Sequence, residues 1–265
     1  NAFAIFAHGT FDISERVSGR FGLRYSKDKK DITVFDGNVS SFSSADPFFF
    51  GQSVQNNPAF ANFIDIGGIF QPAGSVSDKI ESDAITGEAA IEFKPVDDIM
   101  LYASYQRGFK GSSFAPTQTI AASNLIPSVS EESVDAFEIG AKTSWANGRL
   151  IANAAAFHYN YSDFQAFEFL SVGGFLQSFL FSIPEVQIKG IEADIQSNPF
   201  GNLHLNAGIG FLDSEITNAN VVLPPSVTLT ITEGNQIRNA PETNFNMAAW
   251  YDFVSKSGNY YITPQ

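Results

Sequence analysis

The sequence contains no cysteine and no long apolar run, and each absence narrows the kinds of protein it can form. Without cysteine there are no disulfides, no thiolate metal sites and no cysteine nucleophile. No uninterrupted apolar stretch approaches the ~18 residues of a transmembrane helix. Any membrane span in this chain must therefore be made of strands.

Charge is also scarce, and most of it is negative. Charged residues make up 16% of the 265 residues, below the ~25% usual in soluble domains, and the formal net charge is −13. Phosphate binding needs clustered Lys and Arg, so this balance argues against a nucleic-acid partner. We attribute the acidity to exposed loops that gain solubility from it; divalent-cation bridging to anionic lipid headgroups is a second interpretation, without any ligand spacing to support it.

Apolar residues recur at every second position in several segments, most clearly in residues 16–25. One face of that segment is apolar, while the other carries Arg16, Arg20 and Arg24. Three arginines on one strand face are too many for an ordinary core and suit a wet or protein-filled lumen. Residues 85–94, 137–145, 203–211 and 244–253 alternate in the same way. A membrane-spanning barrel needs this two-residue period, because its sheet presents apolar side chains outward and pairs every backbone group.

Short and long connections alternate along the chain. We predict about ten strands, at residues 2–11, 16–27, 80–94, 99–108, 132–145, 149–167, 185–197, 203–213, 243–254 and from 259 onward. The short turns include Asn147-Gly148, a strong hairpin signal, and the long connections cover residues 28–79, 109–131 and 214–242, with a protruding hairpin at 168–184. Bacterial outer-membrane barrels have short periplasmic turns and long extracellular loops. The predicted fold class is therefore all-β, an antiparallel transmembrane β-barrel, present here as a partial barrel.

The chain begins and ends within strand-like segments. Asn1 opens such a segment without a signal peptide, so we expect the natural N-terminus to lie upstream. An open sheet in hydrocarbon has two unpaired edges, and each unsatisfied backbone group costs several kcal/mol. We therefore expect residues 1–265 to be part of a single, larger β-barrel domain.

Five segments resemble the TonB-dependent outer-membrane receptors, in family order and with family spacing. They are residues 101–111 (LYASYQRGFKG), 131–142 (EESVDAFEIGAK), 149–165 (RLIANAAAFHYNYSDFQ), 188–194 (IKGIEAD) and 239–242 (NAPE). The resemblance implies a 22-stranded barrel in the bacterial outer membrane, with an N-terminal plug and a TonB box that this sequence does not contain. It also implies the TonB–ExbB–ExbD complex as energy-transducing partner, outer-membrane lipid and lipopolysaccharide as surroundings, and a scarce nutrient as ligand. The most frequent ligand in the family is a ferric siderophore.

Eight charged side chains are predicted by alternation to project into the lumen. They are Arg20, Arg24, Glu88, Glu92, Glu138, Lys142, Glu192 and Asp194. In one interpretation they form hydrogen bonds with the plug. In the other they are solvated and paired with one another, as Glu138 with Lys142 or with an Arg of a neighbouring strand, which contributes only ~0–1 kcal/mol in wet surroundings. The sequence leaves both interpretations open.

A second set of residues consists of candidate ligand contacts. Phe48, Phe49, Phe50 and Phe175 lie in long connections, where exposed aromatic rings could stack on a catecholate or a porphyrin; loop-to-loop packing is the interpretation we favour. Tyr105, Arg107, Phe109 and Lys110 are expected near the extracellular mouth. Two of them, Arg107 and Lys110, could attract an anionic iron chelate.

No set of residues supports an enzyme. There is no nucleophile elbow, phosphate loop or calcium-loop spacing, and His8, His158 and His204 are isolated from one another. We predict no catalytic residue, no metal site and no cofactor. The functional hypotheses are TonB-dependent uptake of a ferric siderophore, a passive porin or diffusion channel, and a structural or adhesive β-protein.

Overall fold

The fold is a single large antiparallel sheet with a small accessory one. The computed structural model describes residues 2–36, 74–114, 128–172, 175–221, 231–255 and 258–262. Within these ranges ten strands form the main sheet, in the order β1-β2-β3-β4-β7-β8-β9-β10-β11-β12, and β5 and β6 form a two-stranded sheet. None of the described segments is a helix long and apolar enough to cross a membrane.

The strands of the main sheet differ widely in length. Their bounds are β1 (Ala2–Ser14), β2 (Val17–Asp36), β3 (Gly74–Val96), β4 (Ile99–Lys110), β7 (Glu132–Trp145), β8 (Leu150–Val172), β9 (Phe175–Ser197), β10 (Leu203–Asn218), β11 (Thr243–Ser255) and β12 (Gly258–Ile262). The accessory strands are β5 (Ser113–Phe114) and β6 (Ser128–Val129). The predicted all-β, antiparallel architecture and the number of main strands are confirmed.

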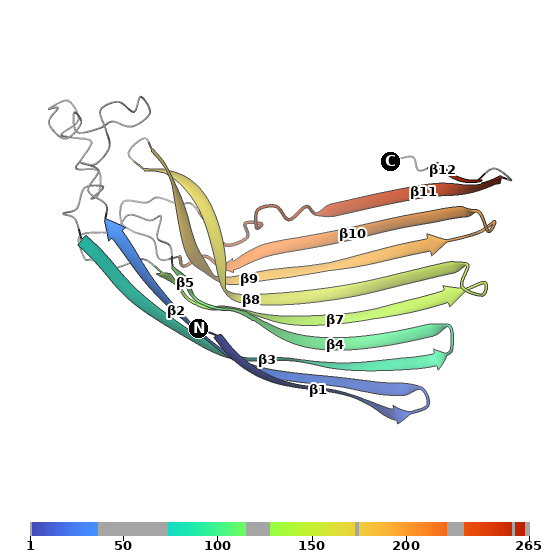
Figure 1. Cartoon of the computed structure of the whole chain (residues 1–265), viewed down its shortest axis with the longest axis horizontal. Coiled ribbons are helices and arrows are strands. Elements are labelled where there is room, and N and C mark those ends of the chain that lie inside the picture. Colours follow the sequence, from blue (N-terminus) through green and yellow to red (C-terminus); the bar gives the residue numbers. More distant parts are fainter. Residues whose placement is uncertain are drawn as a thin grey trace.

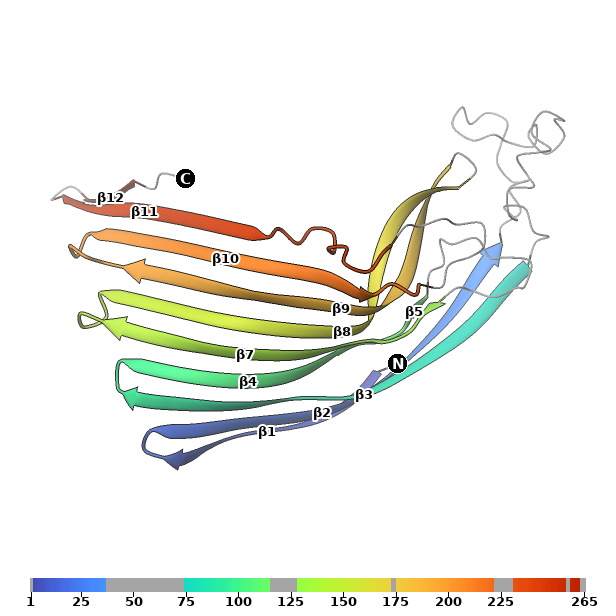
Figure 2. The same ribbon diagram turned by 180° about the vertical axis from the view of Figure 1, so that it is seen from behind.

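The sheet is curved and open, with β1 and β12 as its two edges (Figure 1). The short turns β1–β2, β3–β4, β7–β8 and β9–β10 all lie at one end, where Ser255 of β11 also pairs with Gly258 of β12. At the other end the β2–β3 and β8–β9 hairpins extend as two long arms, which the reverse view shows equally well (Figure 2). The alternation of short and long connections in the sequence therefore corresponds to the two ends of the sheet.

One predicted connection was wrong in extent. Residues 28–36 and 74–79 continue the β2–β3 pairing as far as Asp36 opposite Gly74, although the sequence predicted a connection there. Charged residues occupy both faces beyond Tyr25, so the apolar period ends while the backbone ladder continues. Cross-strand ion pairs accompany the ladder, with Lys27 and Lys29 on β2 facing Glu81 on β3. The two-residue strands β5 and β6 were also missed, because they are too short to show a period.

The register defines two faces of the sheet. Directly paired residues project to the same side, and neighbours along a strand project to opposite sides. One row joins Ser18, Glu92, Tyr102, Gly140, Ala155, Glu192, Gly210 and Asn244. The adjacent row joins Gly19, Ile91, Ala103, Ile139, Ala156, Ile191, Phe211 and Thr243. We call the side of the first row the charged face and the side of the second the apolar face.

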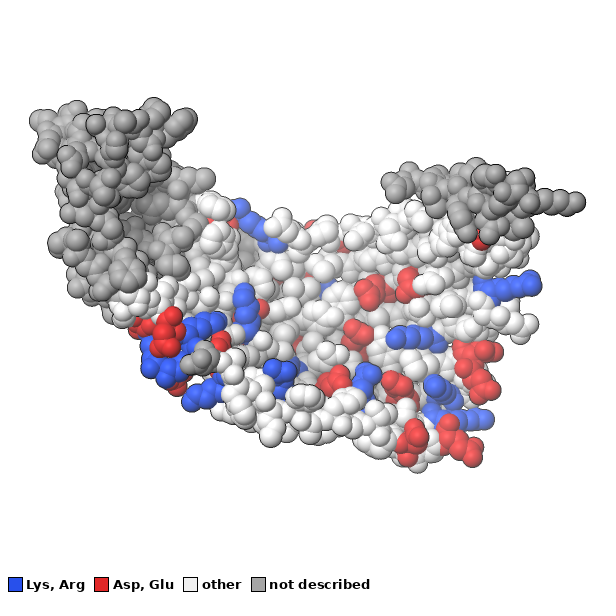
Figure 3. All heavy atoms as spheres, viewed as in Figure 1, with Lys and Arg blue, Asp and Glu red and all other residues white. Residues whose placement is uncertain are grey.

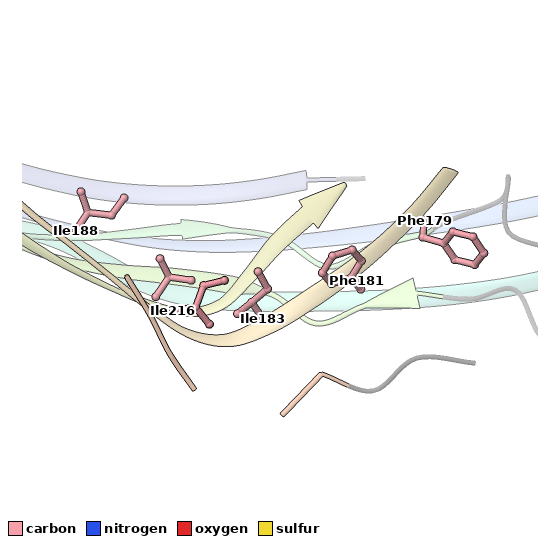
Figure 4. Close-up of a cluster of buried hydrophobic side chains, with 6 residues drawn as sticks. Phe179, Phe181, Ile183, Ile188 and Ile216 are labelled. Atoms are coloured by element: carbon pink, nitrogen blue, oxygen red, sulfur yellow. The ribbon is translucent and has the colours of Figure 1, made fainter. Parts of the chain in front are cut away.

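Buried side chains concentrate at the base of the β8–β9 arm. The cluster consists of Phe179, Phe181, Ile183, Val186, Ile188 and Ile216 (Figure 4). In a regular strand the cluster members on β9 would project to both sides of the sheet. Here the side to which odd-numbered residues project changes at Asp163 and Pro184. Asp163 has a left-handed backbone (φ 53°), and Pro184 cannot donate a hydrogen bond to the ladder. The change brings the outer part of β9 onto the same side as Val186. The arm is thereby attached to residues 231–237, because Ile231 and Ile237 pack against the cluster.

Strands β2 and β3 approach each other closely at Gly87. A Cβ at Gly87 would overlap the backbone carbonyl oxygen of Gly22, whereas a Cβ at Gly9 would meet nothing within 4 Å. We expect Gly87→Ala to destabilise the barrel by about 1–3 kcal/mol, because the strands must separate to admit the methyl group. Gly9→Ala is the matched control, and equal guanidinium unfolding midpoints for the two variants would contradict the predicted close approach.

Candidate functional site

All eight residues predicted to face a lumen lie on the charged face, as the register requires. Figure 3 shows acidic and basic side chains along the sheet, with a dense group of both signs toward its left end and the others spread to the right. Near one edge, Arg20 Nε lies 3.5 Å from Glu88 Oε1, and His8 Nε2 lies 3.4 Å from the same oxygen. Arg24 donates to the hydroxyl of Ser26 at 2.8 Å. These groups are partly exposed, so water screens their charges.

The centre of the charged face is organised by Tyr102. Its hydroxyl donates to Glu138 Oε1 at 2.6 Å, and Lys142 Nζ lies 5.6 Å from the centre of its ring. Glu138 and Lys142 therefore meet through the tyrosine that lies between them. In the next row, Asn153 donates to Asp194 at 3.0 Å. Glu92 and Glu192 share the row of Tyr102 on either side of it.

The contacts on this face form a polar wall. Carboxylates, an ammonium, amides and hydroxyls face the same side with acceptor and donor capacity left over for an additional partner. Two of the organising residues, Tyr102 and Asn153, were not singled out from the sequence. The alternation of Met100, Tyr102, Ser104 and Gln106 places Tyr102 on this face, so the signal was present in the period.

Among the described candidate ligand contacts, Tyr105 and Arg107 meet at Asp135, but the set as a whole does not converge on one site. Tyr105, Arg107 and Phe109 project from the apolar face, while Lys110 projects from the charged face, 3.7 Å from Glu132. Arg107 binds both carboxylate oxygens of Asp135, at 3.0 and 2.9 Å, and Tyr105 donates to the same carboxylate. All four do lie toward the end of the long connections.

The remaining candidates are the phenylalanines of the long connections. Phe48, Phe49 and Phe50 lie outside the described residues. Phe175 is the first residue of β9, at the tip of the β8–β9 arm. A role in ligand contact stays a prediction for all eight candidates.

The apolar face carries a belt of exposed hydrophobic side chains. Phe21, Ile91, Ile139, Ile191 and Phe245 are each at least half exposed. Such a surface is far larger than a soluble monomer exposes. The charged face cannot be the one that meets hydrocarbon, so this face is the one suited to lipid.

The belt has a sharp border toward the long connections. Followed along each strand from the middle of the belt toward the long connections, the apolar face reaches its first charged or polar residue at Lys27 in β2, Asp83 in β3, Arg107 in β4, Asp135 in β7, His158 in β8, Lys189 in β9, Asp213 in β10 and Thr243 in β11. Beyond it the strands exchange ion pairs. At Glu81, Lys29 and Lys27 lie 3.1 and 3.4 Å away and lower the pKa of the carboxyl.

The border crosses the strands at an angle. The row of directly paired residues that starts at the border residue Thr243 in β11 crosses about seven strand-to-strand steps and ends at Gly19 in β2. Gly19 lies roughly eight residues before Lys27, the border residue of β2. With ~3.3 Å per residue along a strand and ~4.8 Å between strands, a flat border requires a strand tilt of about 40°. Transmembrane barrels have tilts of roughly 35–45°. The polar border is thus a level line around a tilted barrel wall.

No group of three or more metal-ligating His, Asp or Glu side chains occurs in the described ranges. The ion pairs of the charged face are spaced along the sheet and do not converge on one point. The sheet therefore has an extended polar surface on one side and, on the other, a belt of apolar side chains suited to contact with lipid.

Comparison with known proteins gives a consistent family. Residues 1–264 match the family model described as TonB dependent receptor-like, beta-barrel. A probable TonB-dependent siderophore receptor, PiuA of Acinetobacter baumannii, is 26% identical over 181 residues. That alignment covers 64% of this chain and 23% of the relative, so the chain spans about a quarter of the relative's length.

Solved structures show the same fold. The ferric yersiniabactin uptake receptor FyuA from Yersinia pestis superposes with a TM-score of 0.69 at 17% identity, over 98% of this chain and 32% of that one. The siderophore receptor PiuA from Acinetobacter baumannii gives a TM-score of 0.59 at 19% identity, over 94% and 31%. The open sheet therefore corresponds to part of a receptor barrel, and the chain belongs to the TonB-dependent receptor β-barrel family.

Proposed function

We propose that this protein is an outer-membrane receptor for TonB-dependent uptake of a ferric siderophore. The proposal rests on the two different faces of the sheet in this chain, which belongs to the TonB-dependent receptor family. One face is a belt suited to lipid outside the barrel, and the other is an extended polar wall inside it. Relatives named as siderophore receptors support the ligand class. A passive diffusion channel is not favoured, because the family is one of TonB-dependent receptors.

The polar wall has a specific role in this proposal. Arg20, Glu88, Glu138, Lys142 and Asp194 line the lumen and form hydrogen bonds with a plug domain, which residues 1–265 surround as part of one barrel. Neighbouring Arg24, Glu92 and Glu192 complete the surface. Exposed ion pairs contribute little individually, so the plug contacts are exchangeable with water, as movement of a plug requires. Energy comes from TonB with ExbB and ExbD, and no catalytic step is involved.

Uptake of iron tests the proposal directly. Iron-starved cells that carry the complete gene and lack other siderophore receptors are given ⁵⁵Fe bound to a catecholate or a hydroxamate siderophore. We expect accumulation with at least one of these chelates and its loss when TonB is deleted. Uptake that persists without TonB would instead indicate a diffusion channel and overturn the proposal.

A further inference from the structure

A groove follows β8 on the apolar face. Its volume is about 610 Å³, and nearly all of its lining is apolar. The floor consists of Ala141 of β7, Ala154 and Ala156 of β8, and Ala193 of β9. Larger side chains form the walls, with Leu101 and Ile139 on one side and Ile191, Ile209 and Phe211 on the other.

The register explains the recess. Ala141, Ala154 and Ala193 occupy one row, with Leu101 and Ile209 at its two ends. In this row three adjacent strands therefore present only methyl groups, whereas in the next row only Ala156 of β8 does, between Ile139 and Ile191. Ala154 and Ala156 follow one another along β8, so the recess is a shallow trough along that strand, a shape that suits an extended hydrocarbon chain.

The groove ends at the polar border. His158, Lys189 and Asp213 form the row immediately beyond Ala156, Ile191 and Phe211. The Lys189 Nζ lies 3.2 Å from Asp213, and both side chains are about half exposed. An ammonium has three N–H donors, so Lys189 can also donate to a phosphate oxygen.

We propose that this groove binds one acyl chain of a phosphate-bearing lipid of the outer leaflet, with the phosphate at Lys189. The inference rests on the membrane location in the proposed function, since the groove lies inside the belt that would contact acyl chains. Lipid surroundings provide no hydrophobic driving force between apolar surfaces, so retention must come from close packing and polar contacts. The recess offers packing against its alanine floor and the larger side chains that border it, and the polar border offers the polar contact.

Substitutions on the apolar face can fill the groove without adding charge to the belt. Ala154→Phe occupies the floor, whereas Ala89→Phe adds the same ring to the apolar face outside the groove. Lys189→Gln leaves the groove open and removes the ammonium. All three are made in the full-length receptor, delipidated in detergent and titrated with dimyristoylphosphatidylglycerol, and native mass spectrometry counts the bound lipids.

We expect the unaltered receptor and Ala89→Phe to retain one lipid at concentrations where Ala154→Phe retains at least tenfold less. Lys189→Gln should weaken phosphatidylglycerol binding several-fold and leave dimyristoylglycerol, which lacks phosphate, unaffected. Equal retention by Ala154→Phe and Ala89→Phe would overturn the proposal. So would a receptor dimer that Ala154→Phe disrupts, because a second copy would then be the occupant.

Ferric siderophore binding, measured on the same preparations, separates this inference from the proposed function. Loss of lipid retention with intact siderophore binding in Ala154→Phe is the expected result. A receptor that retains the lipid but binds neither class of ferric siderophore would contradict the proposed ligand and leave the groove assignment standing.

Discussion

Ile91→Arg is expected to cost about 2–4 kcal/mol of barrel stability, while Ala90→Arg, one residue away, should cost less than about 1 kcal/mol. Ile91 lies on the apolar face and is 50% exposed, so in a bilayer an arginine there would enter hydrocarbon. Ala90 lies on the charged face, where Glu88 and Glu92 flank it on the same strand. The two variants have the same added charge and nearly the same position along the strand, so the main difference is the face that the arginine enters, although Arg20 lies directly opposite Ala90.

The measurement is guanidinium unfolding of the full-length receptor in lipid vesicles, followed by tryptophan fluorescence. A further variant, Ile91→Leu, controls for loss of side-chain packing and should remain within about 1.5 kcal/mol of the parent. If Ala90→Arg proves as costly as Ile91→Arg, the assignment of the apolar face to lipid is wrong.

The faces could be predicted from the sequence because a two-residue period reports them directly. Each charged side chain assigned to the lumen, such as Arg20 and Glu138, has neighbours of opposite character, and a shift by one residue would exchange the faces. The period also separates Arg107 from Lys110, which are three residues apart and hence on opposite faces. The sequence placed the two together because they are close along the chain, but residues three apart in a strand project to opposite faces of the sheet.

The arms were harder to predict, because their pairing does not depend on a buried face. Beyond Tyr25 the β2–β3 ladder carries charges on both sides, so backbone hydrogen bonds and ion pairs hold it without an apolar period. The β8–β9 arm was expected as a protruding hairpin. Its change of phase at Asp163 was not, because Asp is enriched in the left-handed conformation without requiring it, so the residue type alone does not mark the site.

The two ends of the barrel wall therefore follow different rules. Between the turns and the polar border the sequence is constrained on both faces, by lipid on one and by a polar interior on the other. Past the border water reaches both sides, and the β8–β9 arm acquires a small core of its own. That core fixes residues 231–237 against β8 and β9, so the arm positions this described part of the connection that precedes β11.

Phe181→Ala should detach that connection. Phe181 is 5% exposed within the buried cluster, and truncation of a buried Phe typically costs about 3–5 kcal/mol. The loss falls on a local unit, so it should raise the population in which residues 231–242 are released, not unfold the barrel. Arg238 lies in this segment and pairs with Glu168 of the arm at 2.7 Å. Because trypsin cleaves after arginine, the peptide bond after Arg238 can report release of the segment.

We expect cleavage after Arg238 to accelerate roughly a hundred-fold in Phe181→Ala, because proteolysis follows the open population when closing is fast. Phe167→Ala is the matched control, since Phe167 lies on the same arm but is 56% exposed. Its cleavage rate should stay within about threefold of the parent. Equal rates in the two variants would show that the cluster does not hold the connection, and a fall in overall barrel stability with Phe181→Ala would show that the arm is not a separate unit.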